Sequence, residues 1–296
     1  VSKPTFINGT YQVDFENSEK MSTVMQYMRT YNGSMSEDFD SSKIFAPKNG
    51  MIILYSKTSI HDLASDPRYT QNEGNVFDMS DSSPYFVGPE TLKVLANVSD
   101  AELTGKTTQE IIDYCQKKIF EKGGLKNYSV YSMNVQSEEN RSVLGLPMNP
   151  TDGLWFGSPT DLNHIELRNS YMSHQMFRNW TTFMEAELAL LKDIGYNINL
   201  KDYFGKSFYL DNVNDVVNED YNSAKDFAIG VHVYGSNNNI TQTSDIELSG
   251  DGGFGVKIDG IQDKYNFEEG KIELTGNNSI GLGSIYGKEH EINIIK

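Results

Sequence analysis

The sequence predicts a mixed α+β domain over residues 1–209, followed by the first coils of a right-handed parallel β-helix over residues 210–296. Two observations predict this division. Up to Tyr209, segments with helical spacing of apolar residues alternate with short apolar runs typical of strands. After Asp211 the helical spacing stops, and an apolar-Gly-apolar tripeptide recurs at intervals of 25 and 26 residues.

Two helices and one strand are expected before residue 100. The segment Ser18–Tyr31 has apolar residues at the i, i+3, i+4 and i+7 positions of one helical face, namely Met21, Val24, Met25 and Met28. Gly88-Pro89 begins a short helix that continues to Ala96, because the first helical turn does not use the N–H that proline lacks. The apolar run Met51–Tyr55 predicts a buried strand.

Two further helices have clearer boundaries. Thr107–Glu121 has helical spacing and is followed by Gly123-Gly124, which favours termination. Phe183–Ile194 is preceded by Thr182, which has the capping-box spacing relative to Glu185.

The second domain is predicted from repeated strand-and-turn units. The recurring tripeptides are Ile229-Gly230-Val231, Phe254-Gly255-Val256 and Ile280-Gly281-Leu282, and second short strands are expected at Asp245–Leu248 and Lys271–Leu274. A unit of this length without a helix cannot bury its apolar face alone, whereas stacked units can, which predicts a β-helix. A compact antiparallel sheet of hairpins is the alternative. Because an open last edge promotes aggregation, further coils are expected beyond Lys296.

Composition limits the class of partner. The formal net charge of −16 argues against nucleic acid, which requires clustered Lys and Arg. The longest apolar runs are far shorter than the 18 residues or so of a membrane-spanning helix. The single cysteine, Cys115, excludes an intramolecular disulfide and is expected to be an inert core thiol.

Four short elements occur in a fixed order between Tyr85 and Tyr196. They are Tyr85-Phe86-Val87-Gly88-Pro89, Asp161-Leu162-Asn163-His164, Tyr171-Met172-Ser173 and a closing helix that ends in Asp193-Ile194-Gly195-Tyr196. Together they resemble zinc metallopeptidases of the leishmanolysin type and related bacterial enzymes. The resemblance implies a metallopeptidase-like fold for residues 1–209. It also implies that His164 occupies the position of the third zinc ligand and that Met172 lies in the Met-turn beneath the metal.

The zinc helix that this resemblance requires is degenerate. Catalysis in that family uses His-Glu-x-x-His, which places two ligands and the general base on one helical face. The chain lacks this motif, and the matching positions in the expected helix hold Met25, Gln26 and Arg29. The thioether of Met25 is a poor zinc ligand, the Gln26 amide cannot accept a proton from water, and the positive charge of Arg29 repels the zinc ion. The resemblance therefore implies vestigial zinc-site positions at Met25, Gln26, Arg29, His164 and Met172, with no catalytic residue, metal or cofactor. The alternative is an active zinc metallopeptidase whose zinc helix lies before Val1 or is atypical.

A second group of residues suggests a binding surface. Basic and aromatic side chains cluster after residue 167, at Arg168, Tyr171, His174 and Arg178, and such residues are common in interaction hot spots. His164, Glu166 and His174 are an alternative metal-binding group, but polar surface residues are the favoured interpretation.

The repeat region supports a second resemblance. Gly255–Gly260 and Ile280–Lys288 are similar to the early coils of Gram-negative type V autotransporter passengers, whose β-helix stalk ends in an outer-membrane barrel. That resemblance implies a cell-surface, outer-membrane-anchored adhesin in which the former peptidase fold is a non-catalytic binding head. The implied partners are a host-cell surface protein or glycan, or partner bacteria, together with the β-barrel of the same polypeptide. A surface metallopeptidase and a passive spacer are the alternatives.

Overall fold

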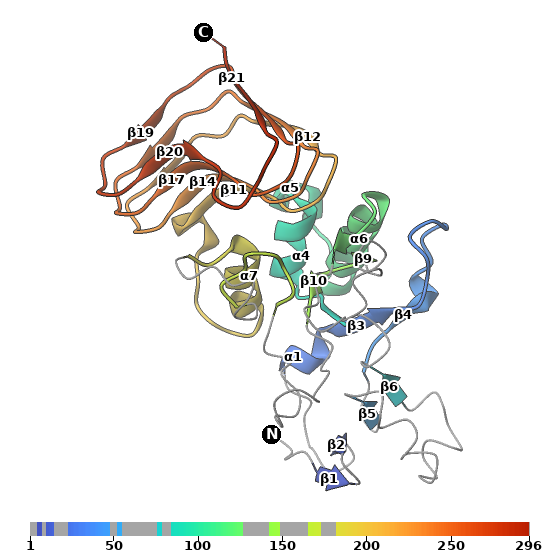
Figure 1. Ribbon diagram of the computed structural model, residues 1–296. Helices are drawn as coiled ribbons and strands as arrows, with labels where there is room; N and C mark the ends of the chain where they lie inside the picture. Colours follow the sequence, from blue (N-terminus) through green and yellow to red (C-terminus); the bar gives the residue numbers. More distant parts are fainter. Residues whose placement is uncertain are drawn as a thin grey trace. The chain divides into compact units, whose positions relative to one another are not determined.

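The computed structural model describes residues 5–7, 10–14, 23–47, 52–54, 76–78, 84–126, 142–148, 165–172 and 182–295 (Figure 1). The chain divides into two compact units. The first comprises Val1–Gly88 and Gly124–Asn179, and the second comprises Pro89–Gly123 and Trp180–Lys296. The helices after Pro89 therefore belong to the same compact unit as the C-terminal strands. The domain boundary predicted between residues 209 and 210 stays a prediction.

The described part of the first unit consists mainly of short strands. One sheet has the order β1 (Thr5–Ile7), β2 (Thr10–Asp14), β5 (Ile52–Leu54) and β6 (Val76–Asp78). A second, antiparallel sheet has the order β10 (Leu146–Pro147), β7 (Tyr85–Phe86), β3 (Met28–Tyr31) and β4 (Ile44–Phe45). The first unit also contains the strand pair β8 (Leu125–Lys126) and β9 (Ser142–Val143) and the 3₁₀ turn η2 (Ser41–Lys43). Strand β5 confirms the strand predicted at Met51–Tyr55.

The helix predicted over Ser18–Tyr31 is wrong in its second half. Helix α1 covers only Thr23–Gln26, and Met28–Tyr31 forms strand β3. Met28 and Thr30 are buried while their neighbours are partly exposed, which is the period-two pattern of a strand. Pairing with β7 on one side and β4 on the other overrides the helical spacing of the methionines. Residues 18–22 lie outside the described part of the chain.

Helices α4 (Pro89–Ala96), α5 (Asp100–Leu103), α6 (Thr108–Glu121) and α7 (Glu185–Asp193) lie in the second unit. The predictions for α4 and α6 are confirmed, and α6 begins with a capping box between Thr107 and Glu110. Helix α7 begins two residues later than predicted. The reason is that the side chain of Glu187, rather than that of Glu185, accepts the backbone N–H of the N-cap residue, which is Met184, at 2.6 Å.

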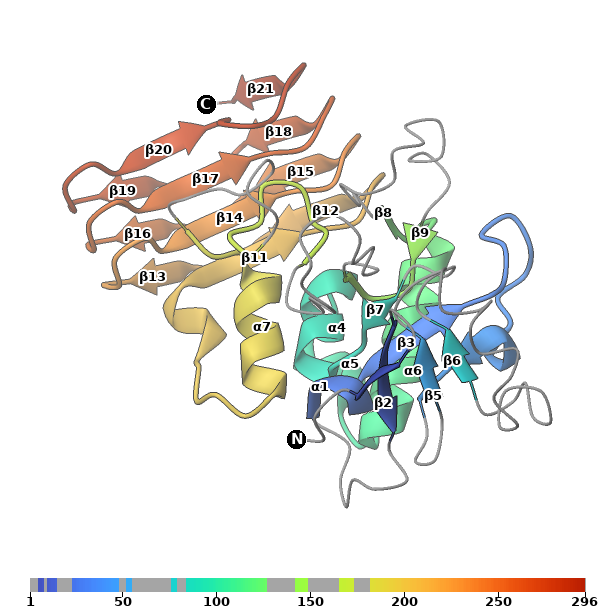
Figure 2. The same ribbon diagram turned by 60° about the horizontal axis from the view of Figure 1, so that its bottom comes forward.

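The C-terminal strands form a parallel β-solenoid of about four turns, which confirms the prediction from the repeat (Figure 2). The recurring tripeptides lie in one sheet, formed by β11 (Phe204–Phe208), β14 (Ile229–Val233), β17 (Phe254–Ile258) and β20 (Ile280–Gly283). The other two sheets are formed by β12 (Asn214–Val217), β15 (Asn239–Gln242), β18 (Lys264–Phe267) and β21 (Glu291–Ile294), and by β13 (Tyr221–Ser223), β16 (Ile246–Leu248) and β19 (Ile272–Leu274). The predicted right-handedness stays a prediction.

Side chains from all three sheets fill the solenoid. Its core includes Phe208, Val231, Val256, Ile240 and Ile246, all of which are buried. The first turn was not predicted, because its tripeptide is Phe204-Gly205-Lys206 and ends in a charged residue. Lys206 instead forms an ion pair of 3.0 Å with Asp215.

Asparagines connect successive turns on the outer side of the β12–β15–β18–β21 sheet. The Nδ2 atom of Asn239 donates to Asn214 at 3.0 Å, that of Asn266 donates to Asn239 at 3.0 Å, and that of Asn293 donates to Asn266 at 2.9 Å. Side-chain hydrogen bonds therefore run through this sheet in the direction of stacking.

Two simpler expectations concern membrane spans and the cysteine. Within the described ranges, none of the helices has the length and apolar character needed to cross a bilayer. Cys115 on α6 is fully buried, and burial raises the pKa of its thiol to about 12. The thiol therefore stays protonated at neutral pH, as expected for an inert core cysteine.

Candidate functional site

The predicted zinc-site residues do not share one helix. Met25 and Gln26 end α1, whereas Arg29 lies in strand β3, where its guanidinium donates to the backbone oxygens of Gln26 at 2.7 Å and Met28 at 2.8 Å. In His-Glu-x-x-His the three functional residues lie on one helix, whereas here only positions 25 and 26 are helical and position 29 is in a strand. The assignment of these positions stays a prediction without that support.

The predicted binding surface is described only in part. Arg168, Tyr171 and Met172 lie in residues 165–172, a compact turn in which the N–H of Ile165 donates to the oxygen of Met172 at 3.2 Å. Tyr171 is exposed, whereas Glu166, from the alternative metal-binding group, is buried. His164, His174 and Arg178 lie outside the described residues. No group of three or more His, Cys, Asp or Glu side chains within the described ranges is placed to hold a metal ion.

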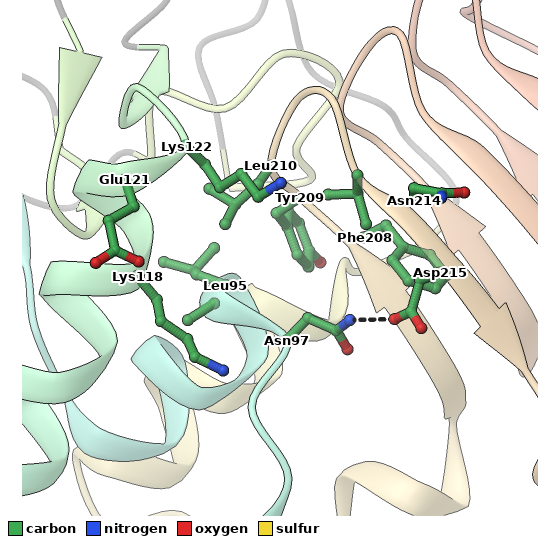
Figure 3. Close-up of a pocket in the computed structure, with 12 residues that line it drawn as sticks. Leu95, Asn97, Lys118, Glu121, Lys122, Phe208, Tyr209, Leu210, Asn214 and Asp215 are labelled. Carbon is green, nitrogen blue, oxygen red and sulfur yellow. Dashed lines mark hydrogen bonds between the residues drawn. The ribbon is translucent and has the colours of Figure 1, made fainter. Parts of the chain in front are cut away.

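A cavity of about 240 Å³ lies in the second unit, between helices α4 and α6 and the first turn of the solenoid. Figure 3 shows the residues that line it. Apolar side chains form much of its wall, and Leu95, Tyr209 and Leu210 are each at most 5% exposed. The polar residues that line it are Asn97, Lys118, Glu121, Lys122, Asn214 and Asp215. The cavity thus combines an apolar wall with charged groups, as small-molecule sites commonly do.

Two of the four charged side chains that line this cavity, Lys118 and Asp215, form ion pairs. Lys118 forms an ion pair of 2.7 Å with Glu102, whose pKa is held at about 2 chiefly by this contact. Asp215 pairs with Lys206 and also accepts a hydrogen bond of 2.9 Å from the Asn97 side chain. Lys122 donates only to the backbone oxygen of Asn212, at 3.2 Å, and has no ion pair in the described part of the chain.

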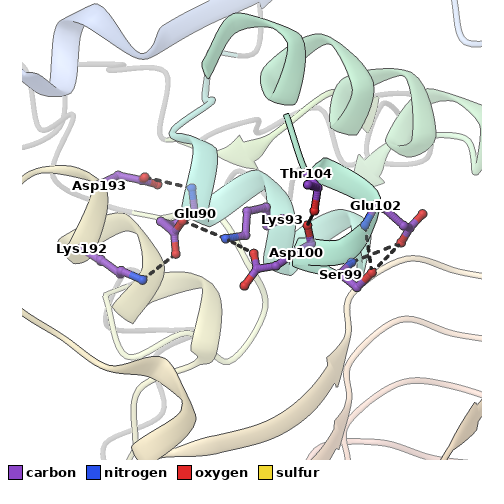
Figure 4. Close-up of polar contacts among 8 residues, drawn as sticks. All are labelled: Glu90, Lys93, Ser99, Asp100, Glu102, Thr104, Lys192 and Asp193. Atoms are coloured by element: carbon purple, nitrogen blue, oxygen red, sulfur yellow. Dashed lines mark hydrogen bonds and ion pairs between the residues drawn. The ribbon is translucent and has the colours of Figure 1, made fainter. Parts of the chain in front are cut away.

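A polar network joins α7 to the start of α4 (Figure 4). The carboxylate of Asp193 accepts hydrogen bonds from the backbone N–H groups of Glu90 and Thr91, at 2.9 and 2.8 Å, and from the Thr91 hydroxyl at 2.7 Å. Glu90 also pairs with Lys192 at 2.6 Å and with Lys93 at 2.9 Å. Because a helix N-terminus favours an acceptor, Asp193 caps α4 from a distant part of the sequence. This contact gives Asp193, from the element Asp193-Ile194-Gly195-Tyr196 that the sequence singled out, a structural role at the first turn of α4.

A cluster of ionisable side chains is buried on the side of the β11–β14–β17 sheet that faces away from the solenoid core. Asp259 pairs with Lys257 at 2.7 Å and with the Nε2 atom of His232 at 3.1 Å, and all three side chains are at most 4% exposed. The ring centroids of Tyr209 and Tyr234 lie 6.0 and 6.3 Å, respectively, from the ring centroid of His232. Ser207 and His232 are paired in register on neighbouring strands. Ser207, His232 and Asp259 have the composition of a hydrolytic triad, but their burial leaves a substrate no access.

Burial sets the protonation of this cluster. It lowers the pKa of His232, and the nearby Lys257 charge acts in the same direction, while Asp259 opposes the shift. Burial also acts to raise the pKa of Asp259, but the contacts with His232 and Lys257 hold it at about 2. At neutral pH the cluster therefore contains an ionised Asp259 and a neutral His232 that donates from Nε2 to the Asp259 carboxylate. Sequence reasoning missed these residues, although His232 and Lys257 stand 25 residues apart at equivalent positions of the repeat.

The lowered pKa of His232 predicts that the second unit loses stability in mild acid. The unfolded chain takes up the proton near pH 6.5 and the folded chain only at lower pH, so stability falls as the pH decreases below about 6.5. For one proton the slope approaches but does not exceed about 1.4 kcal/mol per pH unit. Urea unfolding between pH 7.5 and pH 5 should show this slope, and His232→Gln should flatten it. His290→Gln, at a less deeply buried histidine, should flatten it less. An unchanged slope in His232→Gln would contradict the assignment.

Comparisons with known proteins do not place the chain in a family. No family model matches it, and no solved structure matches it. It is similar to Tail tubular protein A of Klebsiella phage KP34, with 23% identity over 86 residues that cover 28% of this chain and 46% of the phage protein. The match thus spans about half the length of that relative. The metallopeptidase-like fold of residues 1–209 stays a prediction.

Proposed function

We propose that the chain is part of a bacterial surface adhesin of the autotransporter type, in which residues 1–209 are a non-catalytic binding head and the β-solenoid projects that head. The single observation that carries the proposal is the parallel β-solenoid of about four turns that follows the helical part of the chain. A solenoid buries its core between neighbouring turns, so it extends in one direction and suits a stalk. The proposed location is the bacterial cell surface, where the protein would be anchored in the outer membrane.

Two further observations fit this proposal. The net charge of −16 suits a protein that stays dispersed outside the cell. The elements shared with zinc metallopeptidases lack the His-Glu-x-x-His motif, which favours binding over hydrolysis. The proposed ligands are a host-cell surface protein or glycan, or the surface of a partner bacterium.

Adhesion tests the proposal directly. Fluorescent beads coated with the purified chain are expected to adhere to cultured epithelial cells or to other bacteria in a saturable manner. Soluble chain should compete with the beads, and albumin-coated beads should not adhere. Adherence equal to that of the albumin beads on all surfaces would exclude the binding-head proposal and leave the passive spacer.

Metal analysis distinguishes the rival zinc metallopeptidase. If the zinc helix is atypical and lies within the chain, the purified chain contains about one equivalent of zinc, which is lost in His164→Ala, since a catalytic zinc requires three protein ligands. Under the adhesin proposal zinc is substoichiometric and insensitive to this substitution.

A further inference from the structure

Two charged side chains that line the cavity beside the first turn of the solenoid, Glu121 and Lys122, have no ion pair within the described ranges, and both are exposed. Lys118 and Asp215 are neutralised by Glu102 and Lys206, at 2.7 and 3.0 Å. Figure 3 shows the ammonium group of Lys122 extending toward Tyr209 and Leu210, whereas the carboxylate of the neighbouring Glu121 points away from the cavity.

The wall beneath this ammonium group is apolar and well ordered by packing. Leu95 on α4 is fully buried, and Tyr209 and Leu210 are 2% and 5% exposed. The backbone N–H of Ala186 on α7 donates to the Tyr209 hydroxyl at 3.0 Å, which fixes the tyrosine ring. These packed side chains fix the floor of the cavity, and the partly exposed Val213 offers apolar surface to a ligand. Because the floor is preformed, the entropic cost of binding is lower.

The size and charge of the cavity restrict the ligand. A volume of about 240 Å³ lies below the roughly 300–1,000 Å³ of sites for drug-sized molecules. The ligand is thus a compact group with a body of a few carbon atoms. The unpaired positive charge of Lys122 matches one negative charge. Polyanions are disfavoured because the chain carries a net charge of −16.

We propose that this cavity binds a small monocarboxylate with an apolar body, with the carboxylate at Lys122 and the body against Leu210 and the partly exposed Val213. This chemistry has two possible sources, a free aliphatic or aromatic acid and the C-terminal carboxylate of a polypeptide that ends in an apolar residue. The site does not depend on the adhesin proposal.

Ligand titration of the full chain tests the site. Hexanoate and phenylacetate are the probes, and hexanamide is the uncharged match for hexanoate. Saturable binding in the millimolar range is expected for the acids by isothermal titration and saturation-transfer NMR, with the amide at least fivefold weaker. Lys122→Met should weaken hexanoate at least fivefold, whereas Lys122→Arg should retain binding. Lys117→Met, on the same helix but outside the cavity lining, is the matched control and should bind like the unaltered chain.

A peptide arm separates the two sources. An acetylated tetrapeptide ending in leucine is compared with its C-terminal amide. Tighter binding of the free-acid peptide than of hexanoate identifies a polypeptide C-terminus, and binding of the small acids alone identifies a free acid. Equal binding of hexanamide and hexanoate, an unchanged affinity in Lys122→Met, or no saturation by either acid would overturn the proposal. Bead adhesion of the Lys122→Met variant distinguishes the carboxylate-site proposal from the adhesin proposal. If this variant loses carboxylate binding but still adheres, the cavity binds the carboxylate and is not needed for adhesion.

Discussion

Replacing Asp259 by alanine is expected to lower the free energy of unfolding of the second unit by about 3–5 kcal/mol, the usual cost of removing one partner of a buried ion pair. Asp259 contacts both Lys257 and His232, and all three are buried. Alanine leaves the Lys257 ammonium without a counter-charge and the His232 Nε2–H without an acceptor. Urea unfolding followed by the circular dichroism of the β-strands measures the effect.

Two variants make this expectation specific. Glu219→Ala removes an exposed carboxylate from the same solenoid and should change stability by no more than about 0.5 kcal/mol. The double variant Lys257→Met with Asp259→Leu replaces the pair by apolar side chains and should recover much of the loss, since such replacements are often neutral. A loss below about 1 kcal/mol in Asp259→Ala would show that the three groups are not buried together.

Gly230→Ala is the second substitution expected to have a large effect. A Cβ atom at this position would lie 2.5 Å from the backbone oxygen of Gly255 and 2.6 Å from the Cγ2 atom of Ile246. One neighbour is the backbone of the next turn and the other belongs to the solenoid core, so neither gives way easily. Overpacking of this kind costs about 1–3 kcal/mol and can cost more.

The same solenoid provides the control for this prediction. A Cβ atom at Gly253 would come no closer than 3.2 Å to the Cδ1 atom of Leu248 and 3.4 Å to the backbone oxygen of Ala228. Gly253→Ala should therefore change the free energy of unfolding by no more than about 1 kcal/mol. Similar melting temperatures for the two variants would show that the tight contact at Gly230 is not formed.

The solenoid could be predicted because its sequence signal is repeated. Phe254-Gly255-Val256 and Ile280-Gly281-Leu282 each mark the same sheet, so every turn supports the interpretation of the others. The first turn was not predicted, because Lys206 stands where the apolar-Gly-apolar tripeptide has an apolar residue. Lys206 pairs with Asp215. Helices α4 and α6 were predictable from local signals, namely Pro89 at the start of α4 and Gly123-Gly124 after the end of α6.

Other features depend on contacts between distant residues, which the sequence does not display. Strand β3 forms because Met28 and Arg29 pair with β7, nearly sixty residues later, and this pairing overrides the helical spacing around Met25. The Asp193 cap of α4 and the cavity at Lys122 likewise join segments about 90 to 100 residues apart. The vestigial-site positions 25, 26 and 29 were assigned from a helical register that tertiary pairing removed.

The contact between the helices and the first solenoid turn has a consequence for assembly. Strand β11 pairs with β14 on one side, and helix α4 lies against it, while the Asn97 side chain holds Asp215 on β12. A sheet edge occupied in this way offers no template to a foreign strand, so the chain is protected there from linking into fibrils.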